Sequence, residues 1–72
     1  MAIHSSARNQ LRAKVKSIKL GEVMAEVVME LADGQEIVSA ITRTSVESLK
    51  LRENDEVLAV IKSTEVMIGK NA

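Results

Sequence analysis

The sequence predicts a small all-β domain, a five-stranded barrel with one short helix between its third and fourth strands. Three observations carry this prediction. Apolar and polar residues alternate with period two in five segments, as they do in strands that bury one face. Glycine-containing turns separate the first three segments. A single run of hydroxyl residues with a following Glu marks one helix start, after the third segment.

The first predicted strand runs from Arg8 to about Ile18. Its apolar and basic positions alternate as Leu11, Ala13 and Val15 against Arg12, Lys14 and Lys16. The strand ends at Lys19–Glu22, where Gly21 is expected to supply the positive φ of a tight turn. A hairpin to the second strand should follow.

The second strand is predicted over Val23–Leu31 and the third over Glu36–Thr42, joined by a hairpin turn at Asp33–Gly34. The second strand carries Met24 and Val28 among the acids of its second face. The third strand has no charge after its first residue. Because a chain this short has little left to cover these faces, both strands are expected to lie at a subunit interface.

A capping box formed by Thr44 and Glu47 predicts a short helix over about Ser45–Leu49. The fourth strand is predicted over Glu56–Ile61 and the fifth over Glu65–Ile68. Five strands with one helix between the third and fourth is the layout of an OB-like barrel, which closes its edges by Greek-key connections.

Length and composition predict one domain, over residues 6–69, between a flexible lead-in (Met1–Ser5) and a tail (Lys70–Ala72). A chain of 72 residues without Cys has a thin core and no disulfide to support it, so an oligomer is expected. The sequence contains neither an apolar run of membrane-spanning length nor a signal-peptide pattern. We therefore expect a cytoplasmic protein without a membrane partner.

Composition also argues against several functions. Ten basic and ten acidic residues cancel, and Phe, Tyr and Trp are absent, which disfavours nucleic-acid binding. The single histidine, His4, lies near the N-terminus without a partnering nucleophile, so no catalytic residue is predicted. The acidic residues are dispersed, so no metal-cation site is expected. The sequence is interpreted as that of a non-enzyme.

Hydroxyl and basic residues gather in three places, and this pattern is typical of an anion site. The groups are Ser5, Ser6 and Arg8; Ser39, Thr42, Thr44 and Ser45; and Lys62, Ser63 and Thr64. Each has an ordinary alternative, since such residues also cap helices or lie in solvent. The predicted helix start offers free backbone N–H groups to an anion, and Arg8 or Lys62 would complete the charge.

Four blocks of sequence, in order, resemble the molbindin (Mop) family of small molybdate- and tungstate-binding proteins. They are Ser6–Leu11, the strand Val23–Leu31, the segment Ala40–Val46 with Ala-Ile-Thr-x-x-Ser-Val, and Lys62–Ile68. The resemblance implies an OB-like barrel that assembles as a hexamer, a trimer of dimers, with oxyanions held between subunits.

The resemblance also implies which residues hold the molybdate or tungstate. One subunit would contribute Ser6, Ala7, Arg8, Asn9, Lys62 and Ser63, and its neighbour Thr42 and Ser45. The implied role is intracellular molybdenum storage or homeostasis. The alternative is an oligomeric OB-type interaction or scaffold module that binds no oxyanion selectively, and a nucleic-acid-binding OB domain is the third possibility.

Overall fold

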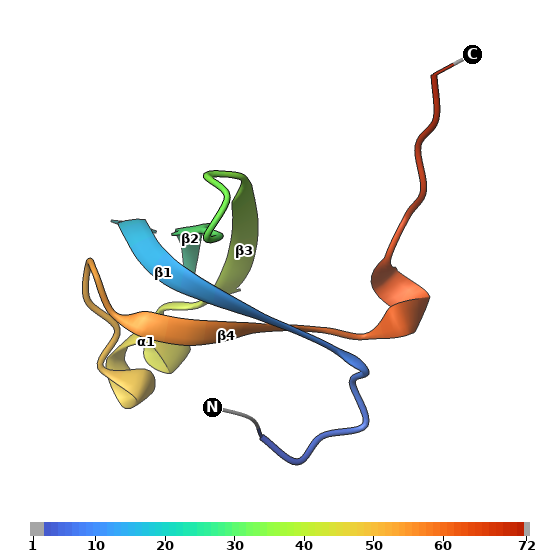
Figure 1. Cartoon of the computed structure of the whole chain (residues 1–72). Helices are drawn as coiled ribbons and strands as arrows, with labels where there is room; N and C mark the ends of the chain where they lie inside the picture. Colours follow the sequence, from blue (N-terminus) through green and yellow to red (C-terminus); the bar gives the residue numbers. More distant parts are fainter. Residues whose placement is uncertain (1–2, 72) are drawn as a thin grey trace.

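A computed structural model describes residues 3–71 as one curled antiparallel sheet with a short helix packed beside it (Figure 1). The sheet order is β3-β2-β1-β4. Its strands are β1 (Asn9–Leu20), β2 (Met24–Glu30), β3 (Glu36–Thr42) and β4 (Glu56–Ile61), with helix α1 (Arg43–Leu49) between β3 and β4 and a 3₁₀ turn, η1 (Ser63–Glu65), after β4. Met1 and Ala2 of the predicted lead-in, and Ala72 of the predicted tail, lie outside the described residues.

The first four predicted strands and the helix are confirmed in place. The bounds of β3 and β4 agree with the prediction. β1 begins at Asn9 rather than Arg8 and extends two residues further, β2 is one residue shorter at each end, and α1 begins at Arg43 rather than Ser45. Val23 lies in the turn before β2 and is 71% exposed, so the predicted start of the second strand is one residue too early.

The fifth strand predicted over Glu65–Ile68 does not form among the described residues. Glu65 closes η1, where its N–H donates to the Lys62 carbonyl oxygen at 2.9 Å. Val66 is extended but pairs with no described strand, and the chain then leads away from the sheet (Figure 1). A strand needs a neighbour to accept and donate its backbone hydrogen bonds, and a period-two pattern does not reveal whether one is present.

A β-bulge in β1 curls the sheet. The first half of β1 pairs with β4 and the second half with β2, and Lys14 pairs with both Glu56 and Glu30. The register shifts between Val15 and Ser17, which leaves Lys16 as the extra residue. The Val15 N–H donates to the Asp55 carbonyl oxygen and its own carbonyl oxygen accepts from the Asn54 N–H, at 2.9 and 2.8 Å. The bulge bends β1 and lets one strand serve two partners.

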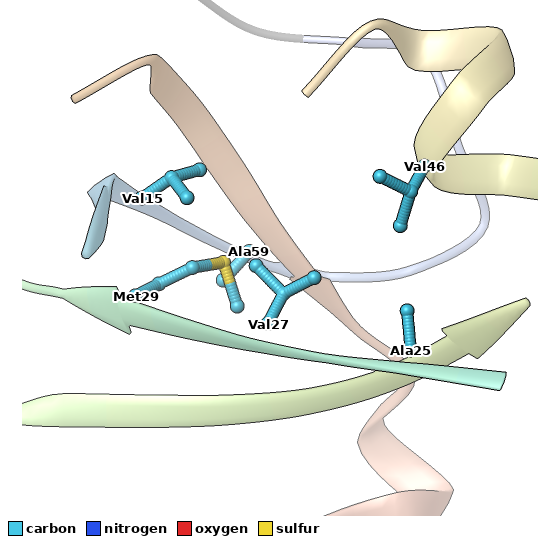
Figure 2. Packing of buried hydrophobic residues seen from close by; sticks show 6 residues of the cluster. All are labelled: Val15, Ala25, Val27, Met29, Val46 and Ala59. Carbon is cyan, nitrogen blue, oxygen red and sulfur yellow. The ribbon is translucent and has the colours of Figure 1, made fainter. Parts of the chain in front are cut away.

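The core lies inside this curl and is small, as the chain length predicts. Figure 2 shows its buried side chains, contributed by all of β1, β2, β4 and α1: Val15, Ala25, Val27, Met29, Val46 and Ala59. On β3 only the inward residues Ile37, Ser39 and Ile41 are half-buried, while Val38 is 60% exposed. The outward face of β3 is therefore left uncovered within one chain, and its expected place at a subunit interface stays a prediction.

The two hairpin turns use glycine for different reasons. Gly34 has φ +89° in the β2–β3 turn, a conformation that side chains disfavour. Gln35 donates its backbone N–H and its Nε2 to the Asp33 carboxylate, which lowers the pKa of that carboxyl. Gly21 does not have the positive φ predicted for it. It is needed for space, because a Cβ there would lie 2.8 Å from the Met24 carbonyl oxygen.

Replacing Gly21 with Ala is therefore expected to lower the free energy of unfolding by about 1–3 kcal/mol, the usual cost of overpacking. Glu22→Ala is the matched control, since Glu22 is an exposed residue of the same turn. Urea unfolding followed by circular dichroism, at one fixed protomer concentration, measures both. Equal stability of the two variants would contradict the steric role of Gly21.

Candidate functional site

Six of the predicted site residues lie at one end of the sheet, where β1 begins and β4 ends. Asn9 pairs with Ile61 at the end of the β1–β4 ladder, so the segment before Asn9 and the segment after Ile61 both leave the sheet at this end. These two segments carry Ser6, Ala7, Arg8 and Asn9 on one side and Lys62 and Ser63 on the other. Residues more than fifty positions apart in the sequence thus share one short edge of the molecule.

Two tight turns set the backbone of this edge. The Ala7 N–H donates to Ser5 Oγ at 3.1 Å, and Ala7 is buried, at 7% exposure. On the other side, Lys62 is the N-cap residue of η1 and has an extended backbone. Ser63 is the first residue of η1. Ser6, Arg8, Lys62 and Ser63 are all exposed, whereas Asn9 is half-buried. Hydroxyl and cationic side chains therefore face solvent around a buried Ala, which suits reversible capture of a small anion from water.

Thr42 and Ser45 lie at the opposite end of β1. Leu20, the last residue of β1, pairs with Ala25, which pairs in turn with Ile41, the residue before Thr42. The strand register therefore separates Thr42 and Ser45 from the edge at Asn9, and one chain does not unite all eight predicted residues.

The helix start is built differently from the predicted capping box. Thr42, not Thr44, is the N-cap: its Oγ1 accepts from the Ser45 N–H at 3.1 Å and lies 2.7 Å from Ser45 Oγ. Glu47 instead faces the Arg43 guanidinium, with Nε and Oε2 3.7 Å apart. The Arg43 N–H donates to the Val23 carbonyl oxygen, so the start of α1 is docked on the β1–β2 turn. Thr42 and Ser45 are among the hydroxyl residues grouped near the predicted helix start, but the predicted cap is Thr44 instead of Thr42.

Thr42→Val is expected to cost about 1 kcal/mol of stability, because the Ser45 N–H then loses its side-chain acceptor. Thr42→Ser keeps the hydroxyl and should retain the wild-type stability. Thermal unfolding of the ligand-free variants measures the difference. If the Val variant is as stable as the Ser variant, the cap observed at Thr42 contributes nothing to folding.

Other kinds of site find no support in the described part of the chain. Across residues 3–71, no group of three or more His, Cys, Asp or Glu side chains is arranged to hold a metal ion. The histidine, His4, is exposed. Among the same residues, no helix is long and apolar enough to cross a membrane.

Comparison with known proteins points to one group. The TOBE domain model matches residues 5–68. The chain is 54% identical over 63 residues to molybdenum-pterin-binding protein 3 of Clostridium pasteurianum, covering 88% of this chain and 93% of that protein. It is similar in structure to a molybdate-binding protein from Sporomusa ovata, with a TM-score of 0.89, 46% identity, and coverage of 94% of this chain and 100% of the other. It also resembles ModG, described as a cytoplasmic molybdate-binding protein, with a TM-score of 0.80 and 43% identity over 85% of this chain and 43% of that one.

Proposed function

The chain belongs to the TOBE-domain family, and within it to the molybdenum-pterin-binding (Mop) proteins, and on this premise we propose that it binds molybdate or tungstate at its subunit interfaces. The observation that carries the proposal is the pairing of Asn9 with Ile61, which joins the Ser6–Asn9 and Lys62–Ser63 segments at one edge. Relatives that this chain matches over nearly their full length are named as molybdate- or molybdenum-pterin-binding proteins. The proposed binding domain spans residues 6–69.

The donor set suits the chemistry of the ligand. Molybdate at neutral pH is a tetrahedral dianion that only accepts hydrogen bonds. Hydrogen-bond donors are offered by the hydroxyls of Ser6 and Ser63, the amide of Asn9, and the cationic groups of Arg8 and Lys62. The two cations balance the two negative charges of the molybdate. Sulfate is smaller and leaves some donors unpaired, at about 1–3 kcal/mol each, while monoprotonated phosphate brings a donor that meets no acceptor.

In this proposal Thr42 and Ser45 are supplied by a neighbouring subunit. The strand register supports this division, because it keeps both residues away from the Asn9 edge of their own chain. Their hydroxyl oxygens are 2.7 Å apart, and both residues belong to the N-terminal cap of α1. The neighbouring subunit would therefore present them as one preformed unit. A site completed by two chains exists only in the assembly, which couples binding to oligomerisation.

The assembly we propose is a homo-oligomer, a hexamer built as a trimer of dimers, in which C-terminal arms are exchanged between neighbours. We define the arm as residues 66–71. Its apolar residues Val66, Met67 and Ile68 are 49%, 94% and 95% exposed, and it leaves its own sheet (Figure 1). Within residues 3–71, no further strand pairs with the outer edges of β3 and β4. An apolar groove lies between these two strands, lined by residues including Val27, Ile37, Ile41, Leu51 and Val60. The apolar arm of one copy of the chain could therefore pair with the open sheet edge and the groove of a second copy.

The proposed role is molybdenum storage or homeostasis in the cytoplasm, by binding rather than catalysis. Reversible hydrogen bonding without covalent chemistry allows release to a cofactor-assembly pathway. The alternative role, an oligomeric interaction or scaffold module, uses the same exposed arm but has no reason to prefer molybdate over sulfate.

Native mass spectrometry of oxyanion-stripped protein, with molybdate or sulfate added, tests the proposal directly. It reports the assembly and the bound anions together, which matters because the chain has no Trp or Tyr for fluorescence. A hexamer that takes up several molybdates and ignores sulfate is the expected result. An assembly that binds neither anion would leave the scaffold module, and salt-sensitive capture of a single-stranded oligonucleotide would instead support the nucleic-acid-binding alternative.

A further inference from the structure

The side-chain amide of Gln10 ties the N-terminal segment back onto β1. Its Nε2 donates to the Ile3 carbonyl oxygen at 3.0 Å, and its Oε1 accepts from the Ile3 N–H at 3.3 Å. The amide thus pairs with both backbone groups of Ile3, as a neighbouring strand would. Gln10 itself is fixed in the β1–β4 ladder opposite Val60. Figure 1 shows the N-terminal segment doubling back from the start of β1.

Two further features restrict the segment between Ile3 and Gln10. The Ala7 N–H donates to Ser5 Oγ at 3.1 Å, and Ala7 is 7% exposed. Ile3 is one of the residues that line the apolar groove of the sheet. The loop is therefore anchored at both ends and tightened in the middle, and the proposed ligand residues Ser6 and Arg8 lie between its anchors.

From these contacts we infer that Gln10 is a positioning residue for oxyanion binding, which it serves without touching the anion. The inference rests on the proposed function. If Gln10 lacked its amide, the segment that bears Ser6 and Ala7 would lose both hydrogen bonds that tie Ile3 to β1 and would keep only its side-chain packing. Each backbone residue that must then be ordered on binding costs conformational entropy, which weakens the complex. The Gln10 clamp, as we call its two hydrogen bonds to Ile3, removes that cost before the anion arrives.

Gln10→Met tests the clamp, because Met keeps the length and bulk of the side chain and removes both hydrogen bonds. We expect molybdate to bind about 10-fold more weakly, which corresponds to the loss of one to two net hydrogen bonds, with most of the change in the dissociation rate. NMR amide exchange of the ligand-free protein should show faster exchange at Ile3 and Ala7. Native mass spectrometry should show an unchanged assembly, which separates positioning from a general structural role.

Gln35→Met is the matched control. Gln35 also uses its amide on a nearby group, donating to Asp33 Oδ2 at 2.6 Å, but in the β2–β3 turn. Its affinity for molybdate should equal that of the wild type. Ser5→Ala, which removes the acceptor of the Ala7 N–H, is a second variant of the same loop and should show a smaller loss in the same direction.

The outcomes separate this inference from the proposed function. Wild-type affinity in both Gln10→Met and Ser5→Ala would overturn the inference while leaving molybdate binding intact. Unchanged exchange at Ile3 and Ala7 in Gln10→Met would likewise overturn it. A wild-type protein that ignores molybdate would overturn the proposed function itself, and with it any binding role of the clamp.

Discussion

Replacing Lys62 or Arg8 with Ala is expected to weaken molybdate binding by about 1.5–3 kcal/mol, or about 10- to 150-fold. In the proposed site, each substitution would remove a charged hydrogen bond to the dianion and leave one oxygen of the ligand unpaired. Both side chains are exposed and make no ion pair among those found in the described residues. Folding and assembly should therefore be retained. Isothermal calorimetry with molybdate measures the loss, and native mass spectrometry checks the assembly.

Lys14→Ala and Arg52→Ala are the charge-matched controls. Lys14 is exposed in the middle of β1, where it pairs with Glu30 and Glu56, and Arg52 lies in the loop before β4. Each control changes the net charge by the same amount, so it corrects for long-range attraction of the anion. Wild-type affinity in both Lys62→Ala and Arg8→Ala would remove these residues from the site. An equal loss in all four variants would mean that net charge alone governs binding.

The double substitution Met67→Lys with Ile68→Lys is expected to break the assembly. Burying a side chain of either type is worth about 1.5–3 kcal/mol, so each exchanged arm loses about 3–6 kcal/mol of apolar contact. Both residues are almost fully exposed within one chain, at 94% and 95%, so the substitutions remove little from the fold of the single subunit. Native mass spectrometry should show smaller species. Molybdate binding should fall with the assembly, because the neighbouring subunit no longer supplies Thr42 and Ser45.

Lys70→Ala is the control for the arm, since it changes charge two residues after Ile68 and leaves the apolar residues in place. Its assembly should match that of the wild type. If Met67→Lys with Ile68→Lys assembles normally, the arm is not an interface element and the proposed exchange of arms is wrong. If it dissociates yet binds molybdate with wild-type affinity, the site is complete within one chain.

Several features of the candidate site could be predicted from sequence because they depend on nearby residues. The donors of Ser6–Asn9 and Lys62–Ser63 stand out as clusters, and the strand before Lys62 is bounded correctly by its alternation. The placement of these two clusters at the same end of the sheet could not be predicted. It depends on the pairing of Asn9 with Ile61, and hence on which strands become neighbours. The contact between Gln10 and Ile3 could not be predicted from the sequence either. A single side-chain amide forms no periodic pattern, and its partner depends on how the backbone folds back.

The sequence by itself determined the elements whose causes are local. Period-two alternation set the bounds of β3 and β4, and Asp-Gly placed the β2–β3 turn at Gly34, because side-chain alternation and positive φ are properties of a few adjacent residues. The tertiary structure alone decided the bulge at Lys16 and the lack of strand pairing after Glu65 among the described residues. Each of these depends on a group distant in the sequence or on a strand that is present or absent. Backbone hydrogen bonds are satisfied between partners in space, so a strand exists only where the fold brings it a neighbour.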